Sequence, residues 1–487
     1  MRHGRISDLI RRSAGALLLL GSLGVSSDTL TFAQDTNGAA PALESQPQGA
    51  DDVYKRAGDR LATQLQQLSY QNAAPQQYSS PSPPSDPGTV AGGDTGEACN
   101  NCDGSGGLFG CSEEPLGDPW TLMSLFDDEC GQNYFKEKRL TIAGWSTFGY
   151  SSNNDGAFTG QGPFLTHSER RNFNVNQQYL YIERKADLTK DWDWGYRGDV
   201  MYGVDGYEGQ SFGNHPGRFD FSNTANGFDQ GFNHGKQAWA IPQLYAEVSK
   251  KDVSVKVGHF YTPTGYEVIP PAANFFYSHQ ITWYNAEAFY HTGALATWNA
   301  SEKLVLTGGW VLGWDSGFDQ FRKGNMGIFG MAYTISDKTV LSTFNTFGNQ
   351  GWRGNGTLSG IILSHKWTDK IMTVSQVDVL STDNPTTFTV DGIAAKSESF
   401  INYVYYEFNP RWKAGYRQEY WHADGVGYQT HTWGVNYKPN ANVIFRPEIR
   451  HMYAPGAPAG AAGTIADNIQ KTYNANTIFG FDVVFTF

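Results

Sequence analysis

Large apolar side chains alternate with small or polar ones in many short segments from about residue 139 onward. The last ten residues, IFGFDVVFTF, show the pattern most clearly. As a strand they place five apolar side chains on one face, namely Phe479, Phe481, Val483, Phe485 and Phe487. A long apolar strand at the edge of a soluble sheet would promote aggregation. A closed barrel in lipid has no such edge, so the pattern favours a membrane barrel.

Sixteen segments of this kind follow one another, and most have about the 9 to 11 residues that a tilted strand needs to cross a bilayer. Pro242 and Pro447 each remove a hydrogen-bond donor inside a segment, which predicts a bulge or a shifted boundary there. The expected strands lie at 139–150, 173–187, 193–204, 237–249, 253–261, 292–300, 304–314, 324–335, 339–347, 356–367, 370–380, 399–408, 411–423, 430–438, 441–453 and 478–487.

The connections between these segments alternate in length. Every even-numbered strand ends in a tight turn, such as SKKD, SEK or SDK, whereas every odd-numbered strand is followed by a looser connection. The long connections are 151–172, 205–236, 262–291, 383–398 and 453–475. Short periplasmic turns and longer external loops are typical of outer-membrane barrels. We therefore expect an all-β fold, a transmembrane antiparallel β-barrel of about 16 strands.

Charged side chains gather on one face of several expected strands. A Lys or Arg that faces lipid near the bilayer midplane costs about 2 to 4 kcal/mol, so this face must point into the lumen. The expected channel-lining residues are Arg197, Asp199, Lys413, Arg417, Glu419, Arg446, Glu448 and Arg450.

The third external connection, 262–291, has an unusual composition. External loops face water, yet this one is rich in large apolar residues such as Phe275, Phe276 and Trp283. They need a surface to pack against, so we expect the loop to fold inward and narrow the channel. The alternative is that its aromatic residues mediate packing between protomers. The candidate polar groups facing the solute are Glu267, His279, Glu287 and His291.

The N-terminal part divides into two regions. Residues 1–33 combine several arginines, the apolar run AGALLLLGSLGV and a small-residue cleavage site, which is typical of a signal peptide. Residues 34–138 are rich in Pro, Ser and Gly, and we expect a largely disordered periplasmic segment with one short helix. In an exported chain its four cysteines favour two disulfides over a metal site. They are Cys99, Cys102, Cys111 and Cys130.

The composition agrees with a barrel and excludes nucleic-acid binding. The chain has 56 Gly, 14 Trp, 26 Tyr and 30 Phe, which suits turn-rich β-structure with aromatic residues at the membrane interfaces. Its net charge of −12 is concentrated in residues 35–138, which hold 16 acidic and 5 basic residues. Residues 139–487 hold 30 acidic and 27 basic residues, or −3, so we expect a mild ionic selectivity.

Two stretches resemble a known family. FNVNQQYLYIERKADLTKDWDWGYRGDVMYGVDG (173–206) and the more specific VGHFYTPTGYEVIPPAANFFYSHQITWYNAEAFYHTGALATW (257–298) are similar to the "putative β-barrel porin" family described as OmpL-like. The resemblance extends over about residues 139–487 and implies an outer-membrane channel. It supplies neither a substrate nor a set of functional residues.

These observations together predict an outer-membrane porin of a Gram-negative-type cell envelope. About sixteen strands leave an aqueous lumen, which suits passive diffusion of small hydrophilic solutes or ions. A structural or adhesive barrel is the alternative. An enzyme is less favoured, because the adjacent residues of Ser278–His279 and Ser364–His365 would point to opposite faces of a strand and could not pair as nucleophile and base. We expect no cofactor and no metal. The expected partners are lipid, the barrel assembly machinery, recognising Phe485 and Phe487, and further copies of the chain.

Overall fold

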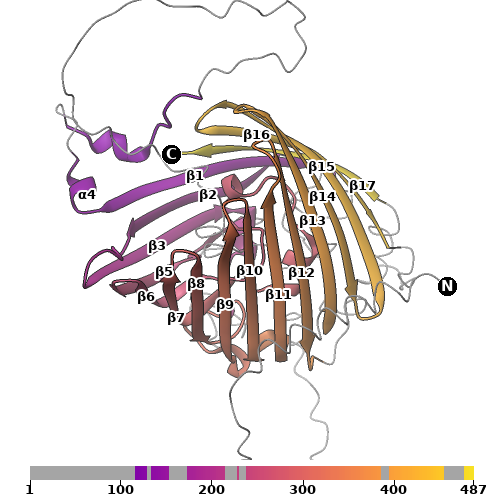
Figure 1. Cartoon of the computed structure of the whole chain (residues 1–487), viewed down its shortest axis with the longest axis horizontal. Coiled ribbons are helices and arrows are strands. Elements are labelled where there is room, and N and C mark those ends of the chain that lie inside the picture. Colours follow the sequence, from indigo (N-terminus) through magenta and orange to yellow (C-terminus); the bar gives the residue numbers. More distant parts are fainter. Residues whose placement is uncertain are drawn as a thin grey trace, which may run out of the picture. The chain divides into compact units, whose positions relative to one another are not determined.

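A computed structural model describes residues 116–128, 133–152, 173–213, 228–229, 237–384, 394–454 and 476–487. The expected signal peptide, the helix near residues 51–71 and all four cysteines lie outside these residues. In Figure 1 the strands stand side by side in one continuous wall. The wall closes because β1 pairs with both β2 and β17, and every pairing is antiparallel.

The sheet has 17 labelled strands, but β4 and β5 both pair with β3 and occupy one position in the wall. The fold is therefore a closed antiparallel barrel of sixteen strands, as the sequence predicted. The strands are β1 (Leu140–Ser151), β2 (Phe173–Arg184), β3 (Asp193–Gly203), β4 (Ala238–Ala240), β5 (Leu244–Lys250), β6 (Val253–Tyr261), β7 (Tyr290–Ser301), β8 (Leu304–Val311), β9 (Asn325–Ser336), β10 (Thr339–Asn349), β11 (Asn355–Lys366), β12 (Ile371–Thr382), β13 (Lys396–Asn409), β14 (Trp412–Ala423), β15 (Val426–Asn440), β16 (Val443–Tyr453) and β17 (Asn476–Thr486).

Short helices lie between the strands and before the first one. They are η1 (Leu122–Phe126), α4 (Tyr134–Glu137), α5 (Val204–Glu208), η4 (Pro271–Ala273), α6 (Ile281–Ala286), η5 (Phe321–Lys323) and η6 (Gly351–Arg353). Among the described residues, no helix has the length and apolar character to cross a membrane.

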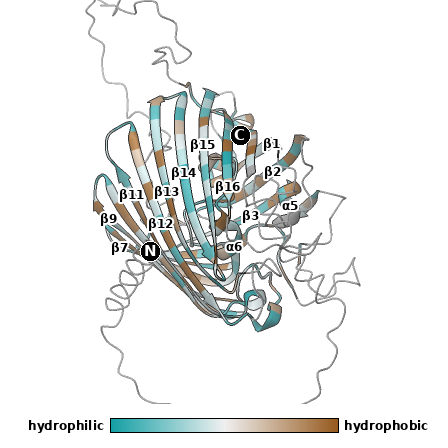
Figure 2. Ribbon diagram, turned by 90° about the vertical axis from the view of Figure 1, so that its right-hand side faces the viewer, coloured by the Kyte–Doolittle hydropathy of each residue, from teal (hydrophilic) through white to brown (hydrophobic). Residues whose placement is uncertain are grey.

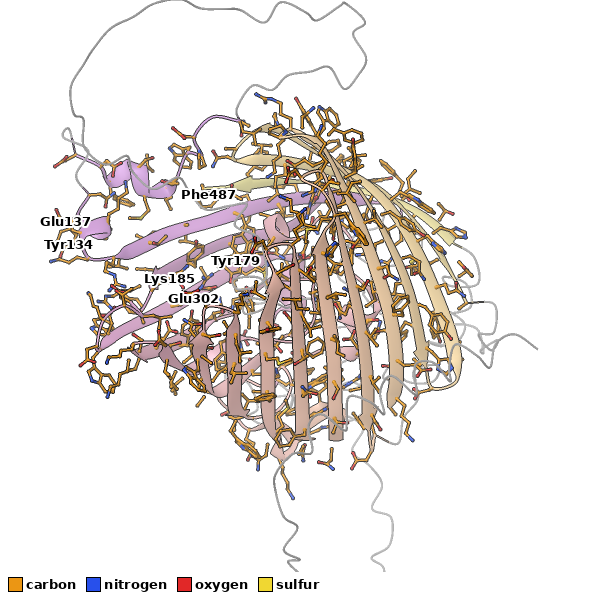
Figure 3. All side chains as sticks on the ribbon, viewed as in Figure 1. Tyr134, Glu137, Tyr179, Lys185, Glu302 and Phe487 are labelled. Carbon is orange, nitrogen blue, oxygen red and sulfur yellow. The ribbon has the colours of Figure 1, made fainter. Side chains whose placement is uncertain are left out.

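The residues just before β1 pack on the barrel. Met123 in η1 is buried, and its sulfur accepts a hydrogen bond from the Ile142 amide at 3.2 Å. Trp120 exchanges two hydrogen bonds with the Asn442 side chain, in the turn between β15 and β16. Figure 3 labels Tyr134 and Glu137 of α4 in this region and Phe487 at the end of the chain. The end of the 34–138 segment is thus attached to the wall.

Side chains alternate between the two faces of the wall. In β3, Trp194 is 55% exposed on the outside, whereas Asp199 on the inside is 2% exposed. In β17 the outward Phe479 and Phe485 are exposed, and the inward Asp482 is buried. Figure 2 shows the same alternation as hydrophobic and hydrophilic colours that follow one another along the strands. Apolar residues therefore face lipid and charged residues face the lumen.

The two prolines inside expected strands have different effects. Pro242 lies in the gap between β4 and β5, where the Asp199 amide bonds to the Gln243 carbonyl, so the predicted irregularity is confirmed. Pro447 stays within β16 and pairs with Phe481 of β17. On the other side of β16, Glu448 and Phe445 pair with β15 but Pro447 does not, as expected for a residue with no amide donor.

Candidate functional site

The connection between β6 and β7, which we call loop 3 (residues 262–289), crosses the inside of the barrel. It contains η4 and α6, and every residue of α6 is buried. Its hydrogen-bond partners lie mainly on β12 to β16, the eleventh to fifteenth positions of the wall, whereas β6 and β7 are the fifth and sixth. In a ring of sixteen strands these positions lie on opposite sides, so loop 3 spans the lumen.

Arg417 and Glu267 form the central contact between the wall and loop 3. The Arg417 guanidinium on β14 donates to the Glu267 carboxylate at 2.5 Å and to the backbone and side-chain oxygens of Ser278 at 2.8 and 2.9 Å. Glu267 also accepts from the Tyr403 hydroxyl at 2.8 Å and the Gln280 amide at 2.8 Å. Both charged side chains are almost fully buried. Loop 3 is therefore fastened by a buried charge pair with further hydrogen bonds to both partners, although Arg417 Nε itself has no hydrogen-bond partner in the described part of the chain.

Two carboxylates of the wall bind backbone amides of loop 3. Glu419 accepts from the backbone amides of Ile281 and Thr282 at 2.8 and 2.7 Å. These amides lie at the start of α6, where the helix itself offers them no acceptor. Glu448 accepts from the Ser278 amide at 3.1 Å. These contacts fix the position of the short helix from outside, because its own preceding residue provides no side-chain cap.

Arg446 on β16 holds the other end of the inserted segment. Its guanidinium donates to the carbonyls of Pro271, Asn274 and Phe276 at 2.6, 2.8 and 3.1 Å. The same side chain pairs with Asp482 of β17 at 2.5 Å. Carbonyl oxygens that the irregular backbone leaves unpaired are thus satisfied by a charged donor from the wall.

A group of acidic side chains lies beside α6. The Gln376 amide nitrogen donates to the Glu287 carboxylate at 2.5 Å and to the Asp378 carboxylate at 2.7 Å, which places the two acids on either side of one amide. Glu287 Oε2 and Asp378 Oδ1 are buried and have no hydrogen-bond partner. Among the residues that the structure describes, no group of three or more His, Cys, Asp or Glu could hold a metal ion.

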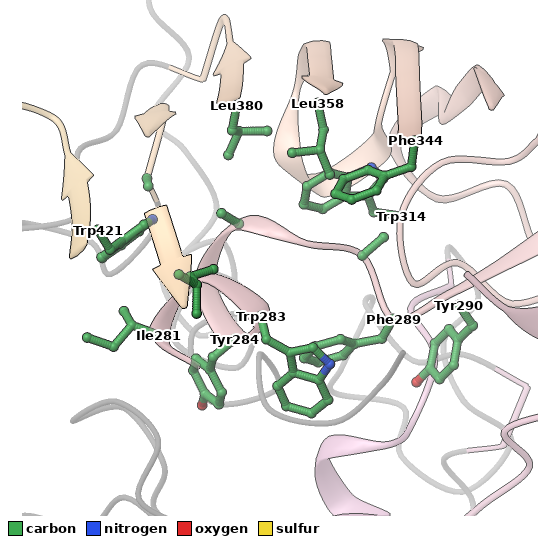
Figure 4. Packing of buried hydrophobic residues seen from close by; sticks show 14 of the residues in the cluster. Ile281, Trp283, Tyr284, Phe289, Tyr290, Trp314, Phe344, Leu358, Leu380 and Trp421 are labelled. Atoms are coloured by element: carbon green, nitrogen blue, oxygen red, sulfur yellow. The ribbon is translucent and has the colours of Figure 1, made fainter. Parts of the chain in front are cut away.

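The aromatic residues of loop 3 fill the space around these polar contacts. Trp283 stacks on the His279 ring, with centroids 3.7 Å apart, and contacts Phe289 at 4.9 Å. Figure 4 labels Trp283 and Phe289 together with wall residues that include Phe344 and Leu358. All of these belong to one buried apolar cluster or lie against it. The lumen around loop 3 is occupied by packed side chains.

Burial and charge shift the proton affinities of the loop carboxyls in opposite directions. Burial alone would raise the pKa of Glu267, but the Arg417 charge and the hydrogen bonds from His279 and Gln280 lower it to about 2. Burial, followed by the charge of Asp378, raises the pKa of Glu287 well above its usual range. The two pKa values differ in direction because the buried Glu267 faces a guanidinium, whereas the buried Glu287 faces another carboxyl group.

The eight expected channel-lining residues all come from the inward face of the wall, but they form separate clusters. Arg417, Glu419, Arg446 and Glu448 contact loop 3, as described above. Arg197 pairs with Asp199 at 2.8 Å within β3, and Asp199 also accepts from Gln243 at 2.9 Å. Arg450 is fully buried, whereas the Lys413 side chain is 32% exposed and lies 3.5 Å from Glu407.

The four polar residues expected to face the solute are all buried. Glu267, His279 and Glu287 lie between loop 3 and the wall. His291, at the start of β7, bonds to the Gly313 carbonyl and the Thr262 hydroxyl at 2.9 Å each. In this conformation their side chains contact protein groups, because loop 3 rests directly on the opposite wall.

Three inward residues of the site were not selected from the sequence: Gln376, Asp378 and Tyr403. All three bind loop 3 or its acidic group. Gln376 and Asp378 stand two positions apart in VSQVDVL, so the period-two pattern of segment 370–380 places them on one face. A search for polar residues at every second position, on the inward face of each strand, would have found both.

Comparisons with known proteins identify the family. The model described as "Putative beta-barrel porin-2, OmpL-like" matches residues 139–487. Similar solved structures include the outer membrane channel DcaP of Acinetobacter baumannii (10% identity, 72% of this chain and 97% of that chain, TM-score 0.46). OmpT of Vibrio cholerae (10%, 72% and 97%, 0.45) and the anion-selective porin from Comamonas acidovorans (10%, 72% and 99%, 0.44) are also similar. No curated protein matches the sequence.

Proposed function

Because the chain belongs to the OmpL-like family of β-barrel porins, we propose that small hydrophilic solutes pass through it by diffusion, along a lumen that loop 3 narrows. The barrel is an outer-membrane porin of sixteen strands, a size that encloses an aqueous channel when the interior is not filled. The observation that carries the proposal is the path of loop 3 across the lumen to Arg417, Glu419 and Arg446.

The burial of the wall charges supports a narrow channel. Seven of the eight expected lining residues are at most 5% exposed, and the hydrogen-bond partners of these charges include loop 3 and neighbouring wall residues. We infer that solutes pass beside the loop and that they are small. Displacement of the loop would widen the route.

The balance of charges supports weak ionic selectivity. Both acidic and basic side chains come from the inner face of the wall. Residues 139–487 hold 30 acidic and 27 basic residues, so the net charge of this region is only −3. Opposite charges across a narrow lumen orient polar solutes without excluding either sign of ion. Reversal potentials in a salt gradient should therefore be small.

A catalytic role has no support in the two Ser–His pairs. Ser278 bonds through its hydroxyl to Arg417, and the neighbouring His279 bonds to Glu267 at 3.0 Å. Ser364 is an inward residue of β11, whereas His365 bonds to Thr339 at 2.9 Å. Neither pair has the Ser–His hydrogen bond of an activated nucleophile. We therefore propose that the protein is not an enzyme.

Three further proposals rest on the sequence. Residues 1–33 direct export, and the segment 34–138 lies in the periplasm, where its cysteines form disulfides. Phe485 and Phe487 belong to the signal that the barrel assembly machinery recognises.

Purified protein in planar lipid bilayers tests the proposed function directly. Stepwise current increments, with small reversal potentials in a salt gradient, are expected for a weakly selective porin. A folded barrel that produces no current increments would favour a structural or adhesive role.

A further inference from the structure

Four side chains beside loop 3 carry buried polar atoms that have no hydrogen-bond partner among the described residues. They come from loop 3 and from two of the looser connections on the same side of the barrel. We call them the Arg353 cluster: Asn285 in α6, Trp314 between β8 and β9, and Gln350 and Arg353 between β10 and β11. Each of the four is at most 1% exposed.

Direct contacts join the members of the Arg353 cluster. The Arg353 Nη2 atom donates to the Asn285 carbonyl oxygen at 2.7 Å. The guanidinium also lies over the Trp314 ring, 5.3 Å from its centroid. The Trp314 backbone amide donates to the Gln350 carbonyl oxygen at 3.0 Å. Figure 4 labels Trp314 among the buried residues around loop 3. The unpartnered atoms therefore belong to residues that meet in one region.

Arg353 is the charged member of the cluster, and its charge is poorly satisfied. A guanidinium has five N–H donors, yet Arg353 Nε and Nη1 have no partner, and its hydrogen bond through Nη2 goes to a neutral carbonyl. Within the described part of the chain, it forms no ion pair with a carboxylate. Burial lowers the pKa of Arg353 to about 10, so the side chain still carries its charge at neutral pH.

Two acids influence Arg353 by their charge but are bound to other groups. Asp424 and Asp315 both raise the pKa of Arg353 against the effect of burial. Asp315 accepts from two backbone amides around the start of β7, at 2.7 and 3.3 Å. Asp424 accepts from two backbone amides around the start of β13, at 3.2 and 3.0 Å. A buried charge without a close partner is strongly unfavourable, so the cluster lacks an anion.

The unpartnered atoms indicate which kind of anion would fit. Four of them are nitrogen donors, namely Nε and Nη1 of Arg353, Nε1 of Trp314 and Nε2 of Gln350. Carboxylate and phosphate groups present several acceptor oxygens to such donors, whereas chloride presents one centre. Two acceptors, Asn285 Oδ1 and Gln350 Oε1, suit hydroxyl groups of the same solute. The Trp352 ring lies 5.0 Å from the guanidinium and adds to an apolar surrounding that strengthens a charge pair.

We propose that the Arg353 cluster binds the carboxylate or phosphate group of a small hydrophilic solute on its way through the barrel. The proposal rests on the proposed diffusion of solutes and adds their chemical class. All four residues are buried, so a bound solute is enclosed and interrupts the ion current. One such site leaves the overall charge balance of the lumen, and therefore the weak selectivity between small ions, as it is.

The first test measures interruptions of single-channel current in dilute KCl. Succinate and inorganic phosphate are added separately, which distinguishes the two sources of an anionic group, and glucose serves as the neutral solute. At least one of the two anions should block the wild type in a concentration-dependent way. Arg353→Met should raise the half-blocking concentration roughly ten- to a hundredfold, because charge-assisted hydrogen bonds are lost. The matched control is Arg322→Met in η5, which removes the same charge from a neighbouring connection and should block like the wild type.

A second test measures binding without conduction. At constant ionic strength, the same anion should raise the melting temperature of the wild-type barrel in detergent above its value in chloride, and Arg353→Lys, which keeps the charge but has fewer donors, should show a smaller rise. If neither anion blocks or stabilises the folded wild type, or if chloride stabilises it equally, the proposal is wrong. Equal weakening by Arg322→Met would also contradict it. A barrel that anions stabilise but that passes no current would support the site and refute the proposed diffusion.

Discussion

Removal of Arg417 should release loop 3 from the opposite wall. The Arg417→Met variant keeps a similar side-chain length but loses the 2.5 Å bond to Glu267 and both bonds to Ser278. Glu267 then keeps its hydrogen bonds from Tyr403 and Gln280 but has no cation beside it. Burial raises the pKa of Glu267 and the Arg417 charge is the largest influence that lowers it, so the variant leaves a buried carboxyl group without its main stabilising partner.

The expected effect is large. Loss of one partner of a buried ion pair costs about 3 to 5 kcal/mol, since the other charge is left uncompensated. Each 1.4 kcal/mol changes an equilibrium tenfold, so the ratio of displaced to docked loop should rise by about two to three and a half orders of magnitude. Replacing both residues, in Arg417→Met/Glu267→Met, removes both charges and should recover much of this loss.

Single-channel recording measures the outcome. Arg417→Met should conduct more than the wild type, with larger or noisier increments, and the double variant should return toward wild-type conductance. Liposome-swelling rates with sugars of increasing size should follow the same order. If the folded single variant matches the wild type, or if the double variant conducts even more than the single one, the charge pair does not fasten loop 3.

Three other predictions follow from the fold. Deletion of residues 479–487 should abolish outer-membrane insertion while export continues, as measured by fractionation and heat-modifiability; a normal barrel in the membrane fraction would contradict an assembly signal there. A chain that begins at Lys136 should retain its conductance, because the described residues before it contact the barrel through Trp120 and Met123, which bond to the Asn442 turn and to the start of β1 and not to loop 3; loss of current from a folded barrel would show that the N-terminal segment gates the pore. The melting temperature of Glu287→Gln should fall less than that of the wild type as the pH rises above 4.5, the usual pKa of a Glu side chain, because burial raises the pKa of Glu287 and the stability of its neutral form is lost as the pH rises through the raised value; equal pH dependence would contradict the assigned burial.

Local pattern was enough to predict the barrel wall. A period of two along 411–423 or 441–453 separates apolar from charged side chains, and turn length depends only on the residues between strands. The break at Pro242 followed from its missing amide donor. The inward path of loop 3 was foreseen from its excess of aromatic residues, which water could not accommodate.

The partners of the luminal side chains could not be predicted in the same way. Arg417 and Glu267 are 150 positions apart, and they meet because the closed wall sets β14 opposite the β6–β7 connection. Whether Glu267 faces water or a guanidinium depends on that closure.

The most direct test of a lumen narrowed by loop 3 is the conductance of a protein in which residues 272–286 are replaced by a short Gly/Ser link. This change removes α6 with Trp283, the Ser278 acceptors of Arg417 and two of the three loop carbonyls that bind Arg446, and it leaves the strands intact. The single-channel conductance in planar bilayers, and the size limit for sugars in swelling assays, should both rise clearly above the wild type. A folded barrel with unchanged conductance and an unchanged size limit would contradict the account.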